Sequence, residues 1–292
     1  MVNIYEQIAS NKRRSFVIIG LFMIFVAFAG YAIGYATDTQ GLLPLAIIFS
    51  FFSTGISYFW GDKIVLGLNQ AHPAPRKEYF DFYTVTENLA MADKVPMPQI
   101  YVIDSAAMNA FATGRDPDHA IVCATSGLLA KLDRTELEGV IGHELSHIKN
   151  YDIRLMTIVS ILIGSLSILV NLSSRSFFFR DRDNDREGGG ILAIVGIIMI
   201  IFAPLIAQLI QLAISRRREY FADASSVMLT RQPSGLISAL KKISTDPNIM
   251  SQASTATASL YICNPFKGNK IASLFSTHPP VADRIKALEG MM

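Results

Sequence analysis

Two histidines four positions apart, His143 and His147, with Glu144 directly after the first, are the residues of this chain whose spacing points most clearly to chemistry. On a helix the two imidazoles lie one turn apart on one face, so each can offer a ring nitrogen to the same metal ion. Glu144 then lies close enough to reach a water molecule on that metal. This H-E-x-x-H pattern is typical of zinc peptidases. The alternative is two surface histidines beside a salt-bridging glutamate.

The motif falls well inside a predicted helix. Asp133, with Glu136 three residues later, predicts a capping box that opens a helix at about Arg134. Apolar residues then recur at helical spacing through the motif: Leu137, Val140, Ile141, Leu145 and Ile148. A catalytic zinc site needs three protein ligands and one open position, so a third ligand must come from elsewhere in the chain.

A second helical segment, residues 218–224, offers that ligand. Glu219 and Asp223 are four apart there and share a face. We expect Glu219 to be the third ligand, because two histidines and a glutamate form a known catalytic zinc set. We expect Asp223 to hydrogen-bond the outward nitrogen of a ligand histidine. The alternative is that Glu219 pairs with Arg216 or Arg218.

The composition predicts a membrane protein. Of 292 residues, 51% are hydrophobic and only 17% are charged, which is too apolar for an ordinary soluble domain. A net charge of +2 argues against nucleic acid as a partner. Cys123 and Cys263 are far apart and in no C-x-x-C pair, so we expect free, buried thiols in a reducing compartment.

Four apolar runs have about the length that a bilayer requires. They are Phe16–Ala36, Leu42–Trp60, Ile153–Leu172 and Ile191–Ile214. The first run is too long for the apolar part of a typical signal peptide, and a second follows at once, so we expect a retained span. If the four spans alternate, the basic residues around Lys12, Lys63, Arg76 and Arg216 share one side. The positive-inside rule makes that side the cytoplasm.

These observations predict a mainly α integral membrane protein with four transmembrane helices and a cytoplasmic zincin-like metalloprotease domain that contains a small β-sheet. Residues 1–60 hold a basic segment and two spans. Residues 61–152 form the first part of the protease, with the sheet and the motif helix. Residues 153–214 hold spans three and four with a loop between them. Residues 215–292 form the second part of the protease, with the third ligand.

Three short segments of the first protease part have strand character: Gln99–Ile103, Asn109–Gly114 and Ala120–Thr125. The last two are joined by a turn and predict a hairpin. This hairpin is either a small structural sheet or an edge that accepts an extended peptide by strand addition. Residues Thr245–Phe266, rich in serine, threonine and alanine, are either a loop over the cleft or a mobile linker.

Three separated motifs together resemble the HtpX family of membrane zinc endopeptidases, which are relatives of the CAAX prenyl endopeptidases. They are His143-Glu144-x-x-His147, Glu219-x-x-Ala222-Asp223, and Ser276-Thr277-His278-Pro279-Pro280 with Arg284. The resemblance covers nearly the whole chain, including the segment that begins at Asn109. It implies one zinc ion per chain, bound by His143, His147 and Glu219, with Glu144 as the base.

The resemblance also implies roles for three residues that the spacing alone does not single out. Asn109 would lie on the edge strand that holds substrate, while His278 and Arg284 would help to bind the substrate or the developing oxyanion. Without the resemblance, His278 would be a loop histidine before two prolines. Arg284 would be a surface residue of the helix that spans residues 281–289.

The resulting expectation is a multi-pass endopeptidase of the bacterial inner membrane with its active site on the cytoplasmic side. Its partners would be the lipid bilayer, misfolded or damaged membrane proteins as substrates under stress, and other quality-control proteases. One alternative is a CAAX-type endopeptidase of prenylated substrates, although those relatives carry more than four spans. A site-2 protease is disfavoured because Arg134 and Lys149 flank the motif. A zinc-stapled, non-catalytic adaptor would not need Glu144.

Overall fold

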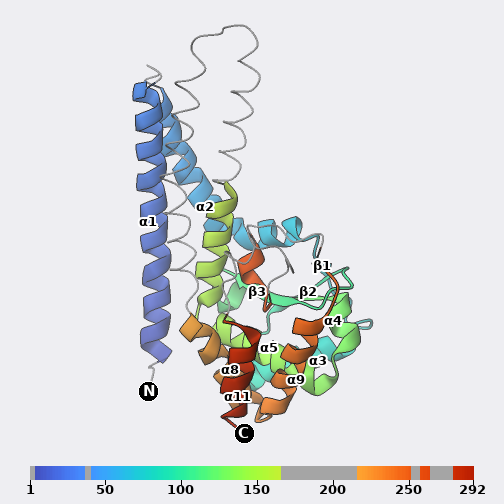
Figure 1. Cartoon of the computed structure of the whole chain (residues 1–292). Coiled ribbons are helices and arrows are strands. Elements are labelled where there is room, and N and C mark those ends of the chain that lie inside the picture. The colour runs from blue at the N-terminus through green and yellow to red at the C-terminus, as the bar shows by residue number, and fades with distance from the viewer. Residues whose placement is uncertain (1–3, 37–40, 166–215, 251–256, 264–278) are drawn as a thin grey trace.

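Two long helices stand beside a part of the chain that holds the remaining helices and a sheet (Figure 1). The structure, a computed structural model, describes residues 4–36, 41–165, 216–250, 257–263 and 279–292. The two helices are α1 (Ile4–Ala36) and α2 (Leu42–Leu68), and they pack against each other. Each contains a stretch long and apolar enough to cross a membrane, Glu6–Tyr31 in α1 and Leu42–Leu68 in α2.

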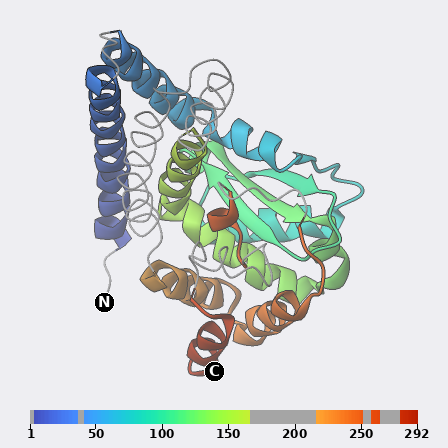
Figure 2. The same ribbon diagram turned by 45° about the horizontal axis from the view of Figure 1, so that its top comes forward.

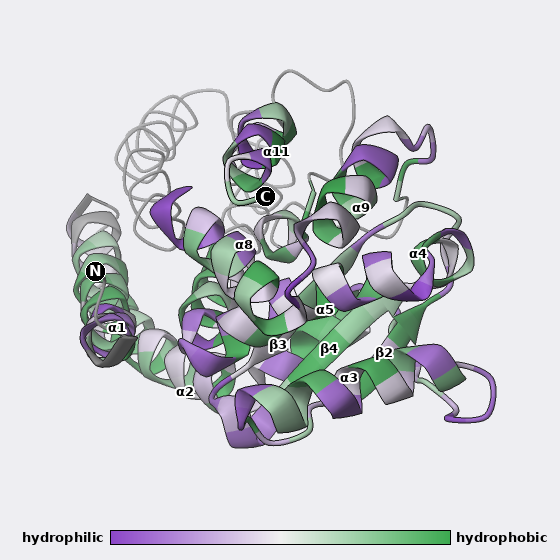
Figure 3. Ribbon diagram, turned by 90° about the horizontal axis from the view of Figure 1, so that it is seen from below, coloured by the Kyte–Doolittle hydropathy of each residue, from purple (hydrophilic) through white to green (hydrophobic). Residues whose placement is uncertain are grey.

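Large apolar side chains cover the outer surface of these helices, and Figure 3 shows their predominantly hydrophobic colour. Examples more than half exposed are Phe16, Ile24, Phe28, Phe51 and Phe52. When large apolar side chains are exposed together in this way, they mark a surface that contacts another protein or a membrane. The two faces that meet are close, since a Cβ added at Gly30 would lie 2.3 Å from that of Ala46. The outer faces of the two helices are therefore suited to contact with lipid, and their inner faces pack against each other.

Both helices extend further than the predicted spans. The first begins at Ile4 rather than Phe16, and the second continues through Gly61 to Leu68. The 33 residues of α1 measure about 50 Å at the rise of an α-helix, against roughly 30 Å of hydrocarbon in a bilayer. The N-terminal turns of α1 therefore project beyond the lipid, beside the part of the chain that carries the histidine motif.

The sheet has four strands in the order β1-β2-β4-β3. Strand β2 (Gln99–Ile103) runs parallel to β4 (Ala120–Thr125), while β3 (Ala110–Gly114) is antiparallel to β4. The three predicted strands and the hairpin are confirmed, with Asn109 just before β3. The prediction missed β1 (His72–Pro73), which pairs with β2 over two residues and is too short to show a period. Strand β3 is an edge of the sheet.

Helix α5 (Arg134–Lys149) carries the motif and packs between the sheet and the C-terminal helices, as Figure 2 and Figure 3 show. The elements around it are α3 (Phe80–Asp93), α4 (Ser126–Lys131), α8 (Arg216–Thr230), α9 (Pro233–Thr245) and α11 (Val281–Glu289). Its apolar residues at helical spacing, such as Val140 and Ile141, form the main core with Val122 of β4 and Leu240 of α9. The predicted α5 is confirmed, including its first residue.

The third apolar run is described only in part. Residues 152–165 are helical, and their apolar face packs against α1 through contacts that include Leu155 and Ile158 with Ile18 and Phe22. The remainder of that run, the loop 173–190 and the whole fourth run lie outside the described residues. The described part thus contains two helices of membrane length and a small mixed sheet, while the four-span topology stays a prediction.

Candidate metal centre

The N-terminus of α5 is fixed by the predicted capping box. The Asp133 carboxylate accepts from the backbone N–H of Glu136, and the Glu136 carboxylate accepts from the backbone N–H of Asp133. Three turns later the motif lies in the interior. His143, Glu144 and His147 are 0%, 2% and 5% exposed. The alternative of two surface histidines is therefore wrong.

Glycine allows α8 to approach α5 closely at the motif. A Cβ added at Gly142 would lie 2.8 Å from Ser226 Oγ and 3.3 Å from Ser226 Cα, both in α8. Real Cβ atoms essentially never lie within 3.0 Å of another such atom, so a side chain at this position would force Ser226 or the backbone of α8 to shift. This approach brings Glu219, near the start of α8, to the histidine pair.

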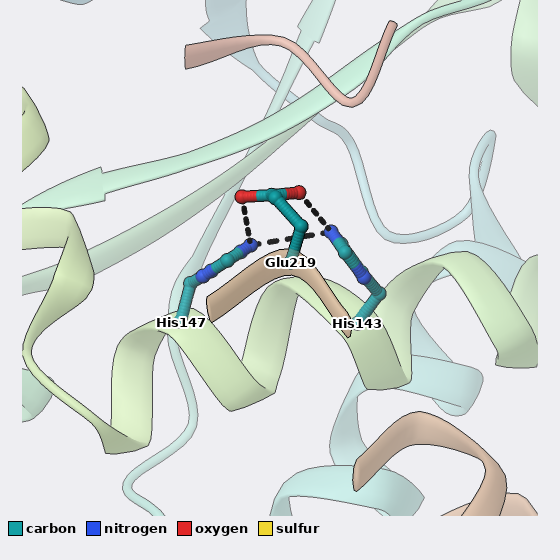
Figure 4. Close-up of side chains that lie close together, drawn as sticks. All are labelled: His143, His147 and Glu219. Atoms are coloured by element: carbon teal, nitrogen blue, oxygen red, sulfur yellow. Dashed lines mark hydrogen bonds and ion pairs between the residues drawn. The ribbon is translucent and has the colours of Figure 1, made fainter. Parts of the chain in front are cut away.

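The three predicted ligands converge on one point (Figure 4). His143 Nε2 lies 3.2 Å from His147 Nε2, and each of these nitrogens lies 3.6 Å from one Glu219 oxygen. Tetrahedral zinc with bonds of 2.0–2.2 Å separates its ligand atoms by about 3.4 Å. The donor atoms and their spacing therefore fit a zinc ion, and these residues form a candidate metal-binding group. Glu219 is buried and does not lie on the exposed face of α8.

The outward nitrogen of each histidine meets a carboxylate. His143 Nδ1 lies 2.9 Å from Asp223 Oδ1, and His147 Nδ1 lies 3.0 Å from Asp152 Oδ2. Such contacts fix the tautomer and direct the lone pair of Nε2 toward a metal. The sequence predicts the role of Asp223 but not that of Asp152. A carboxylate at the very start of an apolar run was the one signal that pointed to it.

Negative charge around the site favours a cation. Burial by itself lowers the pKa of His143, but Asp223 and Glu219 outweigh it and raise that pKa to about 9. The pKa of His147 is also raised, by Glu219 and Asp152 against the effect of burial. Burial raises the pKa of Glu144 above its usual value. The surrounding carboxylates thus favour a positive charge at the two histidines, and Glu144 is suited to take up a proton.

Arg284 of α11 is fully buried, so it is not the surface residue that the bare sequence allows. Its Nε donates to Asp223 Oδ2 at 2.8 Å and its Nη2 to Oδ1 at 2.6 Å, a two-pronged contact. Burial alone would raise the pKa of Asp223, but Arg284 and His143 lower it to about 2. Arg284 therefore lies behind His143 as part of the same network.

The outer edge of β3 is occupied by the segment 257–263, which includes η2 (Ala258–Leu260). The amide of Asn109 donates to Cys263 O at 2.9 Å and accepts from Cys263 N at 3.3 Å, while Ile262 N donates to Ala110 O. Tyr261 is buried against Phe111. This part of the predicted 245–266 loop is packed rather than a free linker. His278 lies outside the described residues.

Residues 80–292 match the family model described as Peptidase family M48. The chain belongs to this family. A Protease HtpX homolog of Streptococcus uberis is 44% identical over 296 residues, covering 99% of this chain and all of that protein. A second, from Lactobacillus helveticus, is 42% identical over 298 residues with the same coverage.

The fold of this M48 peptidase is also similar to the crystal structure of S. mikatae Ste24p, with a TM-score of 0.50 and 21% sequence identity. The similarity covers 93% of this chain, which spans 62% of the Ste24p chain. Family membership and the two apolar helices identify a membrane metalloprotease. Cys123 and Cys263 are buried thiols, as predicted, and neither belongs to the metal-binding group.

Proposed function

We propose that the chain is a zinc endopeptidase that cleaves misfolded or damaged membrane proteins at the cytoplasmic face of the bacterial membrane. The observation that carries the proposal is the group of three converging side chains, His143, His147 and Glu219, with Glu144 next to His143 in the sequence. This group lies near the N-terminal end of the membrane-length helix α1. A role in quality control and stress, alongside other membrane proteases, follows from the resemblance to HtpX.

In this proposal His143, His147 and Glu219 hold the zinc ion, and Asp223 and Asp152 keep the two imidazoles turned toward it. Zinc held by these residues would lower the pKa of a bound water to about 7 and would polarise the scissile carbonyl. Glu144 accepts a proton from the attacking water and returns it to the leaving nitrogen. Its raised pKa in a buried setting suits both transfers.

The edge of β3 is the proposed substrate site. Asn109 already pairs with both backbone groups of Cys263, which is how it would hold one residue of an extended substrate. Substrate binding then requires the segment 257–263 to move from the edge. We propose that Arg284 acts through Asp223 on His143; contact of Arg284 or His278 with the oxyanion stays a prediction.

Metal analysis and proteolysis of the purified, full-length protein test this function together. We expect about one zinc per chain in the wild type and in Glu138→Ala, a partly exposed α5 control, and little zinc in Glu219→Ala. Casein should be cleaved in detergent and protected by a chelator. Full zinc in Glu219→Ala, or cleavage that a chelator does not block, would refute the proposal. Preference for a farnesylated peptide would favour the CAAX-type alternative.

A further inference from the structure

The first membrane helix reaches the metal centre. We propose that Asn11 of α1 is a positioning residue of the metalloprotease, which holds Asp152 and, through it, the ligand His147. The inference rests on the proposed zinc site. It means that α1 does more than anchor the chain, because one of its side chains completes the network behind a metal ligand.

A short series of hydrogen bonds joins α1 to the ligand. Asn11 Nδ2 lies 2.8 Å from Asp152 Oδ1 and 2.8 Å from the carbonyl oxygen of Asn150. The other oxygen of Asp152 faces His147 Nδ1 at 3.0 Å. Asn11 and Asp152 are each 2% exposed. The buried side chain of Asn11, near the N-terminus of the chain, is therefore linked to the ligand His147 through a single residue, Asp152.

The neighbouring residue of α1 holds the same turn. Lys12 Nζ lies 4.1 Å from the centre of the Tyr151 ring, and the Arg154 guanidinium lies 4.9 Å from that centre. Tyr151 has a left-handed backbone, with φ of 60°. Such a conformation is strained for a non-glycine residue, so its surroundings must hold it. Lys12 and Asn11 thus fix the turn that places Asp152.

The same carboxylate also contacts α8. Arg218 Nη1 donates to Asp152 Oδ1 at 3.0 Å, and Arg218 directly precedes the ligand Glu219. Arg218 Nη1 also lies 3.4 Å from the Asn11 side-chain oxygen. Arg218 compensates the charge of Asp152, while Asn11 fixes its orientation. Asp152 is therefore the point at which α1, α5 and α8 meet.

Anchoring alone does not account for this contact. The apolar face of α1 already packs through Ile18 and Phe22 against Leu155 and Ile158. A buried amide is costly unless its hydrogen bonds are made, and hydrophobic residues would serve for packing. What the amide adds is orientation of the carboxylate behind His147, and partners of this kind tune metal affinity.

Metal affinity of the full-length protein in detergent tests the inference. Replacing a direct partner such as Asp152 is expected to weaken zinc binding roughly 10–100-fold. For Asn11→Ala, one bond further away, we expect about a 5–10-fold loss in competition with a chelator. Asn11→Asp, which keeps the shape but removes both donors, should also weaken binding. Ser15→Ala is the matched control, because Ser15 is buried one turn later and its hydroxyl donates to Asn11 O.

A double-mutant cycle separates positioning from general stability. If Asn11 acts through Asp152, the effect of Asn11→Ala on zinc affinity disappears in an Asp152→Ala background. The visible spectrum of the cobalt-substituted protein should change in Asn11→Ala and not in Ser15→Ala. Wild-type affinity in both Asn11 variants, or an undiminished effect in the Asp152→Ala background, would overturn the inference. Failure of the wild type to bind zinc would instead refute the proposed function.

Discussion

Charge decides what the buried site can hold. Among the described residues, the carboxylates of Glu144, Asp152, Glu219 and Asp223 surround the histidine pair, and Arg218 and Arg284 are the buried cations beside them. With neutral imidazoles this set carries two uncompensated negative charges. Buried charges are costly unless paired or bound to a metal. Two protonated imidazoles, or one divalent cation bound between two neutral imidazoles, would balance this charge, so the charge of the site is compatible with a metal ion.

Glu144 differs from the other carboxylates because it is assigned neither a zinc-ligand role, as Glu219 is, nor a contact with a ligand histidine, as Asp152 and Asp223 are. We predict that Glu144→Gln keeps about one zinc per chain and lowers casein cleavage at least about 100-fold, since an amide cannot accept the proton of water. Zinc content and cleavage rate are measured on the same preparation. Glu138→Gln is the control on the same helix. Cleavage at the wild-type rate by pure Glu144→Gln protein would remove Glu144 from the mechanism.

Arg284 offers a test between two roles. Lysine keeps the charge but cannot make the two-pronged contact with Asp223. If Arg284 positions Asp223 behind His143, Arg284→Lys should weaken zinc binding by about tenfold. Chelator competition measures this. A raised KM for casein with unchanged zinc affinity would point instead to contact with substrate, the role that the family resemblance implies.

The sequence indicates the ligands far better than the residues behind them. His143, Glu144 and His147 have a spacing that only a helix converts into one site, and Glu219 follows from the need for a third ligand. Asp152 and Asn11 have no such pattern. Their roles depend on how a turn after α5 packs against α1, a contact between residues 141 positions apart. Local spacing carries no information on such packing.

At the scale of the elements, the distance between α5 and α8 sets the site. We predict that Gly142→Ala costs roughly 1–3 kcal/mol of stability, because the added methyl meets Ser226 and forces the helices apart. It should also reduce zinc content by displacing Glu219. Gly67→Ala in α2 is the control, since a Cβ there has no neighbour within 4 Å. Equal thermal midpoints and zinc contents for the two variants would contradict this prediction.

Glu136 ties the start of α5 to α9. Its carboxylate accepts from Ser238 Oγ at 2.6 Å and from Lys242 Nζ at 2.7 Å. Burial by itself raises the pKa of Glu136, but these hydrogen bonds outweigh it and lower the pKa below its usual 4.5. A lowered pKa in the folded state contributes stability above about pH 4.5, which is lost as the pH falls through the lowered value.

We therefore predict that Glu136→Gln is less stable than the wild type at pH 7, by roughly 1–2 kcal/mol for the lost cap and charged contact. The difference should shrink as the pH falls below about 4.5. Urea unfolding in detergent from pH 7 to pH 3 measures it, with Glu138→Gln as the control. A difference that is constant across this range would show that ionisation of Glu136 contributes nothing.

Element boundaries show where sequence patterns fail. The strand and helix periods correctly predict β2, β4 and α5, because each carries its own local signal. The start of α1 and the end of α2 are not visible in the sequence, since polar residues such as Glu6 and Asp62 continue a helix as well as apolar ones do. Hydropathy predicts only the part of a helix that contacts lipid, whereas α1 and α2 continue beyond that part into the aqueous phase.

For the whole molecule, the contact of Asn11 with Asp152 has a consequence for topology. It places the N-terminal end of α1 on the same side of the membrane as the metal centre, however many spans follow Asp152. Figure 1 shows the start of α1 and the C-terminal helix α11 at that end, away from the last residues of α1 and the first of α2. The basic residues Lys12, Arg13 and Arg14 lie on this side, so the positive-inside rule predicts that it faces the cytoplasm.

Cysteine labelling tests that orientation on intact cells. Gly41, between α1 and α2, and Ala9, near the start of α1, are both exposed, whereas the native thiols Cys123 and Cys263 are buried. A membrane-impermeant maleimide should label Gly41→Cys in intact cells and Ala9→Cys only after the cells are opened. Because Asn11 binds the turn behind His147, labelling of Ala9→Cys from outside would put the metal centre outside as well. The substrates would then have to be sought on the outer face.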